Sequence, residues 1–190
     1  FETQLGVNHL GHFALTARLM PTVLSTPGAR IASMSSMAHR SGQLVIDDLM
    51  FDLRGYSRWQ AYFQSKLANL LFTAELQRRL AEAGAGTIAV AAHPGVARTH
   101  LGSQGHGPST WLTRVGLVIG GRSASSGALP LLRAATDPAV LGGQFYGPRW
   151  GAVGHPVLET PSQQARDEAS ARDLWKASVD LTGLEPDLTG

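Results

Sequence analysis

Apolar positions recur along the chain with two different periods, and each period predicts a different kind of element. From residue 59 to 83 they recur every three or four positions with no proline, which predicts an amphipathic helix ending near Gly84-Ala85-Gly86. Residues 2–24 have the same period and predict a first helix. The apolar positions of this first helix include Leu5, Leu10, Phe13 and Leu19.

Two further helices are predicted nearer the C-terminus. Residues 122–135 carry the helical period with Pro130 inside it. Residues 165–179 form an amphipathic pattern whose inward face includes Leu174 and Trp175. The polar tail, residues 182–190, is expected to be frayed.

Three short apolar segments predict strands. Residues 30–35 alternate and follow the turn at Thr26-Pro27-Gly28. Residues 87–92 are continuously apolar after the threonine, as expected for a strand buried on both faces. Residues 144–146 form the third. The alternation of helix and strand predicts an α/β fold with a parallel sheet, organised as a single domain over residues 1–190.

The ends of the first two predicted strands carry the candidate chemistry. Ligands of an open parallel sheet bind in the crevice outside the carboxyl ends of its strands. Ser36 ends the first strand and Pro94-Gly95 follow the second, so both are expected on one rim, with the helix of residues 59–83 between them. Residues 37–58 predict a long surface loop over this rim, and residues 100–119 a loop and short helix covering a pocket.

Composition excludes several classes of function. A formal net charge of +2, without basic runs interleaved with aromatic residues, does not favour a nucleic-acid partner. No segment has the roughly 18 apolar residues of a membrane span. Cysteine is absent, which removes disulfides and thiolate chemistry and fits a cytoplasmic protein.

Tyr62 and Lys66 stand four residues apart on the longest predicted helix. Residues at this spacing are neighbours, so the ammonium can stabilise an ionised phenol and make it able to exchange protons at neutral pH. The chain has two lysines, Lys66 and Lys176, and arginine could not relay protons in the same way. Taken alone, the pair is more often a solvated contact on a helix surface.

Taken together, four motifs resemble the short-chain dehydrogenase/reductase family. They are Asn8 in Val7-Asn8-His9-Leu10-Gly11-His12-Phe13, Ser35-Ser36, Tyr62 with Lys66, and His93-Pro94-Gly95 with Thr99. Residues 35–42, 66–72 and 143–148 with Leu174-Trp175 look most like its retinol dehydrogenase and WW-domain oxidoreductase branch. The order and spacing match over nearly the whole chain.

The resemblance implies an oxidoreductase that transfers a hydride between a nicotinamide cofactor and an alcohol or carbonyl substrate. Tyr62 would be the general acid/base. Ser36 would hydrogen-bond the substrate oxygen, with Ser35 the competing choice. Lys66 would favour the phenolate and bind the nicotinamide ribose, and Asn8 would seat a water that links Lys66 to solvent. The residues on the nicotinamide side would be Pro94, Gly95, Val96 and Thr99.

The resemblance also implies a fold: the C-terminal part of a doubly wound Rossmann fold, with three strands and flanking helices. The glycine-rich unit that holds the pyrophosphate is expected to be missing, as in an N-terminally truncated chain. The residues that distinguish NADP from NAD would be missing with it, although the branch favours NADP. The first strand would then lie open at the sheet edge, which allows a homo-oligomer.

Other interpretations stay open beside the enzyme. The chain could be a catalytically silent module that binds a partner or dimerises. Light-driven reduction of a tetrapyrrole is disfavoured because no cysteine can donate the proton. Asn8, Ser36 and Pro94-Gly95 could each be structural. No metal site is expected, because the histidines lack paired carboxylates at ligand spacing.

Overall fold

The protein, seen in a computed structural model that describes residues 1–95 and 123–189, is built on a four-stranded sheet. The strands are β1 (Arg30–Met34), β2 (Ile88–Ala92), β3 (Phe145–Pro148) and β4 (Pro156–Glu159), in the order β1-β2-β3-β4. The first three are parallel, and β4 is antiparallel to β3. The mixed α/β architecture with a parallel sheet is therefore confirmed.

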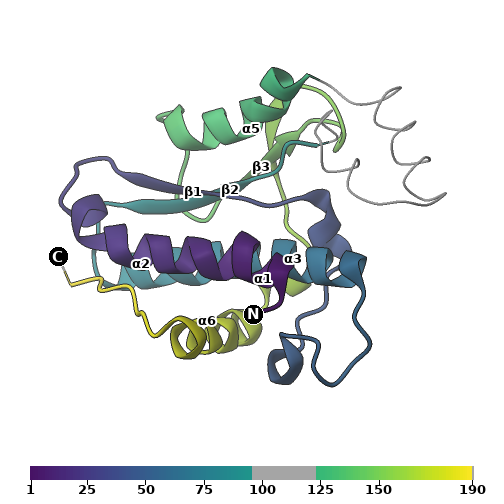
Figure 1. Cartoon of the computed structure of the whole chain (residues 1–190). Coiled ribbons are helices and arrows are strands. Elements are labelled where there is room, and N and C mark those ends of the chain that lie inside the picture. Colours follow the sequence, from purple (N-terminus) through teal and green to yellow (C-terminus); the bar gives the residue numbers. More distant parts are fainter. Residues whose placement is uncertain (96–122, 190) are drawn as a thin grey trace.

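Helices cover both faces of the sheet. The chain begins with α1 (Thr3–Leu5), a π-helical turn η1 (Gly6–Leu10) and α2 (Gly11–Leu24). The other helices are α3 (Arg58–Glu82), α5 (Ala124–Thr136) and α6 (Glu168–Thr182), with 3₁₀ turns η2 (Met37–Ser41), η3 (Ile46–Asp48) and η5 (Gln164–Arg166). Figure 1 shows α2, α3 and α6 on one side of the sheet and α5 on the other. None of the helices in the described part could cross a membrane.

The expectation of three strands was wrong, because β4 was missed. It begins at a proline and returns antiparallel to β3 after residues 149–155, where Gly151 and Gly154 take positive φ angles. Only four residues long and half-exposed, β4 has no clear alternation that a sequence pattern could detect. At the other side β1 is an edge strand within the described part of the chain, so association through this edge stays a prediction.

The longest helix, α3, packs between the sheet and α6 and supplies much of the core. Leu67, Leu71, Leu76 and Leu80 are at most 1% exposed. The helix ends in a glycine cap, as the sequence predicted: Gly84 has φ +67° and the Ala85 N–H bonds the carbonyl of Leu80. β2 is almost wholly buried, again as predicted.

A cluster of aromatic rings joins α2, α3 and α6. The ring of Phe13 lies 5.2 Å from Trp175 and 5.6 Å from Phe72, and all three side chains are buried. Met20 joins them from α2, seven residues after Phe13 on the same helix face, whereas Leu19 is exposed. The helical pattern of the sequence, in which Leu19 is one of the apolar positions, does not by itself separate these two residues.

The C-terminal tail packs back onto the same core and is not frayed over its described length. Pro186 is buried, and Leu188 packs against the cluster of Phe13 and Trp175. Glu185 lies 3.8 Å from Arg79 of α3. The tail is polar in sequence, so its few apolar contacts gave no signal strong enough to predict this packing.

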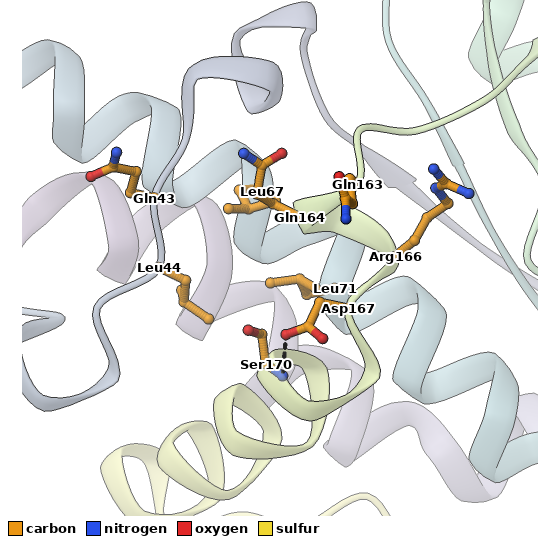
Figure 2. Close-up of a pocket in the computed structure, with 9 residues that line it drawn as sticks. All are labelled: Gln43, Leu44, Leu67, Leu71, Gln163, Gln164, Arg166, Asp167 and Ser170. Atoms are coloured by element: carbon orange, nitrogen blue, oxygen red, sulfur yellow. Dashed lines mark hydrogen bonds between the residues drawn. The ribbon is translucent and has the colours of Figure 1, made fainter.

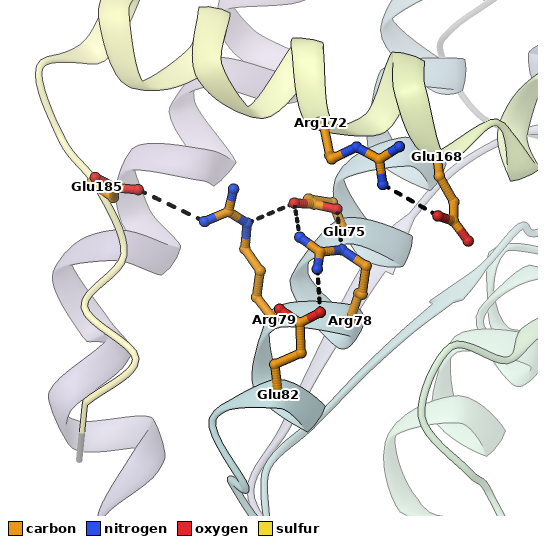
Figure 3. Close-up of polar contacts among 7 residues, drawn as sticks. All are labelled: Glu75, Arg78, Arg79, Glu82, Glu168, Arg172 and Glu185. Atoms are coloured by element: carbon orange, nitrogen blue, oxygen red, sulfur yellow. Dashed lines mark hydrogen bonds and ion pairs between the residues drawn. The ribbon is translucent and has the colours of Figure 1, made fainter.

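A buried carboxylate on α3 is neutralised by two arginines of the same helix (Figure 3). Glu75 is 2% exposed and accepts hydrogen bonds from Arg78 at 2.7 and 2.8 Å and from Arg79 at 2.7 Å. A buried charge is tolerated only when it is paired in this way. These contacts hold the pKa of Glu75 below its usual range despite its burial, which acts in the opposite direction.

His9 makes the stability of the fold depend on pH. It is 1% exposed, and its Nε2 lies 2.8 Å from Ser178 Oγ, which donates its own proton to Leu174 O. His9 is therefore the donor to Ser178, and the neutral ring carries no proton at Nδ1. Burial lowers the pKa of His9 from 6.5 to about 4.

We expect acid to destabilise the protein through this residue. Between pH 6.5 and about 4 the unfolded chain binds a proton at His9 that the folded protein does not, so the free energy of unfolding falls as pH falls. The full shift corresponds to about 3 kcal/mol. Urea unfolding at pH 7 and 4.5 should show a smaller loss for His9→Gln than for the natural chain.

Candidate active site

The register of the sheet brings the turn at Ser36 and the turn at Pro94-Gly95 side by side. Met34 pairs with Ala92, and the Ser35 N–H donates to the carbonyl of Ala92 at 2.8 Å, so β1 and β2 end at the same level. Ser36 and Pro94 therefore leave the sheet at one rim. This is the edge at which ligands of parallel sheets bind.

The helix α3 runs past this rim in the opposite direction to β1. Asn69 Nδ2 donates to Met34 O at 2.9 Å, and Ser35 Oγ donates to Lys66 O at 2.8 Å. Lys66 thus lies level with the last residues of β1. Tyr62, one helical turn earlier, lies about 6 Å farther along the axis, beyond the end of the strand. The helix and the strand together place residue 62 of α3 beyond the end of β1, at the level of the rim.

Lys66 and Tyr62 are neighbours on the same face of α3. The ammonium lies 5.8 Å from the centre of the Tyr62 ring. Lys66 is half-buried, and among residues 1–95 and 123–189 no carboxylate forms an ion pair with it. Burial lowers the pKa of its ammonium below the usual range. A partly desolvated cation beside a phenol is an arrangement that stabilises negative charge on the phenol oxygen.

Asn8 contacts the same helix from the π-helical turn η1. Its Nδ2 donates to Gln4 Oε1 at 3.1 Å and to Ser65 Oγ at 3.0 Å. Ser65 donates its proton to the carbonyl of Tyr62 at 2.8 Å, so its oxygen must accept from Asn8, which fixes the orientation of the amide. Asn8 Oδ1 is left as an acceptor at the side of the Tyr62 turn.

The two adjacent serines have different surroundings. Ser35 is 2% exposed, and its proton is used by Lys66 O, so it ties β1 to α3. Ser36 is half-buried and caps η2, where its Oγ accepts from the Ala38 N–H at 3.2 Å. An accepting hydroxyl keeps its own proton to donate. The turn that Ser36 caps ends at Gly42, which lies so close to α3 that a Cβ there would come within 2.7 Å of Phe63 O.

We expect alanine substitution to affect kcat strongly at Ser36 and little at Ser35. Ser36→Ala should lower kcat about 100-fold, the effect of losing a donor to the reacting oxygen, and should cost about 1 kcal/mol of stability because the Ala38 N–H loses its cap. Ser35→Ala should leave kcat within a few-fold but cost about 1 kcal/mol of stability, because Lys66 O loses a buried partner. Steady-state kinetics and urea unfolding measure both. If Ser35→Ala were the inactive variant, the choice between the serines would be reversed.

The turn after β2 is, like Gly42, a place where the backbone leaves no room for a side chain. Gly95 has φ +69°, and a Cβ there would come within 2.4 Å of Ala152 O, so a larger residue does not fit. Its N–H donates to His93 Nδ1 at 3.1 Å. Val96 and Thr99, predicted on the nicotinamide side, lie outside the described residues, as do residues 100–119.

The loop predicted for residues 37–58 is well anchored next to the candidate site. Buried Asp48 accepts from the N–H groups of Leu53 and Arg54 at 2.9 and 3.1 Å. The Arg54 guanidinium lies 3.8 Å from the ring centre of Phe51 and donates to Gln64 Oε1 at 2.5 Å. Because Gln64 is two residues from Tyr62, the loop is fixed to the helix that carries the candidate acid/base.

A hollow of about 730 Å³ lies elsewhere on α3 (Figure 2). It is lined by Leu67 and Leu71 of α3, by Gln43 and Leu44, and by residues around the start of α6. Leu67 and Leu71 point away from the face of Tyr62 and Lys66, at about 100° or more around the helix. Neither Tyr62 nor Lys66 lines this hollow, and it holds none of the candidate chemistry.

Sequence patterns missed two contributors to this region. Ser65 links Asn8 to Tyr62, and only its place beside the Tyr62-Lys66 pair could have drawn attention to it. Glu159 reaches His93 from β4, 66 residues along the chain, at 3.2 Å. No spacing rule connects these two residues, because the strand that brings Glu159 there was not predicted.

Comparison with known proteins gives a consistent set of relatives. No protein-family model matches the chain. Retinol dehydrogenase 13 of Homo sapiens is 40% identical over 191 residues, which cover 97% of this chain and 55% of that protein. Human retinol dehydrogenases 12 and 14 are each 37% identical over 97% of the chain. The chain spans about half the length of these curated relatives.

A solved structure agrees with this similarity. The crystal structure of an uncharacterized protein from Mycobacterium paratuberculosis superposes with a TM-score of 0.75 at 41% sequence identity. The match covers 98% of this chain and 61% of that one. The chain is thus similar to this protein in both sequence and fold.

Proposed function

The chain belongs to the short-chain dehydrogenase/reductase family as a homologue of its retinol dehydrogenases, and from that premise we propose that the protein is a nicotinamide-dependent oxidoreductase with Tyr62 as its general acid/base. Its substrate would be an alcohol and its product the carbonyl compound, or the reverse. The observation that carries the proposal is the half-buried Lys66 ammonium, without a carboxylate partner in the described part of the chain, beside the Tyr62 phenol.

The role of Tyr62 is to hold or give one proton at the substrate oxygen. During carbonyl reduction the phenol would donate its proton to the developing alkoxide, and during alcohol oxidation the phenolate would accept it. Lys66 supports both directions because a nearby cation lowers the energy of the phenolate. The low polarity around Lys66 strengthens this interaction, since fewer water dipoles oppose it.

Ser36 and Asn8 would complete the site. The free proton of Ser36 could bond the substrate oxygen and hold it toward Tyr62. Asn8 Oδ1 could accept from a water that also contacts the Lys66 ammonium, which would open a route for protons to solvent. The hydrogen bond from Asn8 to Ser65, and from Ser65 to Tyr62 O, supports this role because it couples η1 rigidly to the Tyr62 turn.

The residues described fit the nicotinamide end of a cofactor, NADP or NAD. Lys66 offers an ammonium that no side chain of the described residues satisfies, which suits ribose hydroxyls, and Gly95 offers backbone with no side chain in the way. When bound, the nicotinamide would supply or accept the hydride. Pro94, Gly95, Val96 and Thr99 would line its pocket. A cytoplasmic location stays a prediction.

Hydride transfer can be tested directly. Protein incubated with NADPH or NADH deuterated at C4 and a series of apolar aldehydes should yield alcohols that carry deuterium on the former carbonyl carbon, with equal loss of absorbance at about 340 nm. No deuterium in any product, with the protein folded by circular dichroism, would favour the binding or dimer-forming module instead.

A further inference from the structure

His93, the residue between β2 and the Pro94-Gly95 turn, is more deeply buried than the rest of the rim. Its side chain is 0% exposed, and its ring lies 5.3 Å from that of Phe145. Both ring nitrogens have partners: Nδ1 lies 3.1 Å from the Gly95 nitrogen, and Nε2 lies 3.2 Å from Glu159 Oε1. The ring fills the space above Gly147, where a Cβ would come within 2.1 Å of Nε2.

These contacts determine where the proton of His93 lies. A backbone N–H can only donate, so Nδ1 must accept from Gly95 and carries no proton. The single proton of the neutral ring is then on Nε2 and points to the Glu159 carboxylate, which can only accept when ionised. Glu159 therefore selects the tautomer in which Nδ1 is free to hold Gly95. Burial lowers the pKa of His93 and keeps the ring neutral, consistent with this geometry.

The Glu159 carboxylate also lies near η2, the turn that Ser36 caps. Glu159 Oε2 lies 3.9 Å from Arg40 Nη2, and this guanidinium also donates to Thr160 O at 3.3 Å. Arg40 belongs to η2, the turn that Ser36 caps. The last residue of β4 thus contacts Arg40 in the turn that Ser36 caps and His93, which directly precedes the Pro94-Gly95 turn.

A second histidine, His39, holds the turn η2 through hydrogen bonds. His39 Nε2 accepts from the Ser162 N–H at 3.2 Å, so its proton is on Nδ1, which donates to Ser36 O at 2.6 Å. Its ring lies 5.5 Å from Phe145, the residue that His93 also contacts. The segment that follows β4 therefore supports η2 at His39 as well as at Arg40.

We propose that Glu159 is a positioning residue: through the tautomer of His93 it holds the Pro94-Gly95 turn, and through Arg40 it keeps this turn in register with Ser36. This proposal rests on the proposed function, because that function makes the Pro94-Gly95 turn the nicotinamide side of the site and the turn at Ser36 the substrate-oxygen side. β4 then serves as a brace for the site, although it contributes no group that touches substrate.

The tautomer and the Gly95 amide can be measured without any activity. In ¹⁵N-labelled chain at pH 7, long-range ¹H–¹⁵N spectra should show His93 protonated at Nε2 alone, and hydrogen exchange should show a protected Gly95 N–H. Glu159→Ala should mix the two tautomers and speed exchange of Gly95 about tenfold, as expected for loss of one charge-assisted hydrogen bond. Glu159→Gln should retain both signals, because its amide oxygen still accepts from Nε2.

Two comparisons keep the test specific. Glu168→Ala removes another glutamate of an ion pair, with Arg172 at 3.2 Å on α6, and should change neither signal at His93 or Gly95 (Figure 3). In kinetics, Glu159→Ala should raise the KM for the nicotinamide cofactor about tenfold with a smaller change in kcat, and Glu159→Gln should restore it.

The outcomes separate this proposal from the proposed function. Unchanged His93 tautomer and Gly95 exchange in Glu159→Ala would overturn the positioning role even in an active enzyme. A Gln variant that behaves like the Ala variant would also overturn it, since an acceptor at this position would then not suffice. If the natural chain were inactive but both NMR signals were as expected, the oxidoreductase function would be contradicted and the positioning role of Glu159 would still be supported.

Discussion

Replacing Tyr62 with phenylalanine is expected to lower kcat/KM about 10³-fold, the range expected for loss of a general acid/base. The phenyl ring keeps the contacts of Tyr62 with Trp59 and Phe63, whose ring centres lie 6.5 and 6.3 Å away. The substituted ring would therefore occupy the same place on α3 without the proton. Steady-state kinetics, with urea unfolding to show equal stability, measures the effect.

Tyr56 provides the matched control for this substitution. It lies six residues earlier, just before α3, and the hydroxyl of this largely exposed residue donates to Glu2 Oε1 at 3.2 Å. Tyr56→Phe removes one phenol oxygen from the neighbourhood of α3 but should leave kcat/KM within about twofold, because a single hydrogen bond contributes little. Equal losses in the two variants would contradict the assignment of Tyr62.

Lys66→Met is expected to lower kcat/KM about 100-fold or more, the range expected for removing one group that stabilises charge in a transition state. Methionine matches much of the lysine stem, so packing along α3 is kept while the cation is lost. The pH–rate profile of kcat/KM should also differ from that of the natural chain, because the proton acceptor in the transition state loses a favourable charge. Stability should not fall, since burial already disfavours the charged form of Lys66, as the lowered pKa of its ammonium indicates.

Lys176 is the control for this second substitution, because it is the other lysine of the chain and lies exposed on α6. Lys176→Met changes the net charge by the same amount and should alter neither kcat/KM nor the pH profile. A profile that shifts equally in both variants would mean that Lys66 acts only through the overall charge of the protein.

How much of the site could be predicted from the sequence depends on how far apart the site residues lie along the chain. Tyr62, Ser65 and Lys66 lie on one helix, so their relative positions follow from helical periodicity once the helix is recognised. The pairing of Ser36 with the Pro94-Gly95 turn also followed from sequence, because parallel strands joined by a helix end at one edge. The roles of these residues stay predictions.

Other features needed the tertiary structure. The π-helical turn η1 around Asn8 has the same apolar pattern as the helices around it, so periodicity cannot reveal it. Leu19 and Met20 are both apolar, and only packing against Phe13 and Trp175 decides that Met20 is the buried one. The choice between Ser35 and Ser36 likewise rests on which hydroxyl finds Lys66 O.

By itself the sequence determined the order of the main helices and of the first three strands, the α/β architecture and the helix that carries Tyr62 and Lys66, because these depend on periods and caps within short segments. The structure alone decided that β4 joins the sheet and that Glu159 reaches His93. Such contacts between distant segments depend on how strands pack and on which polar groups must be satisfied when buried, and short-range patterns do not encode either.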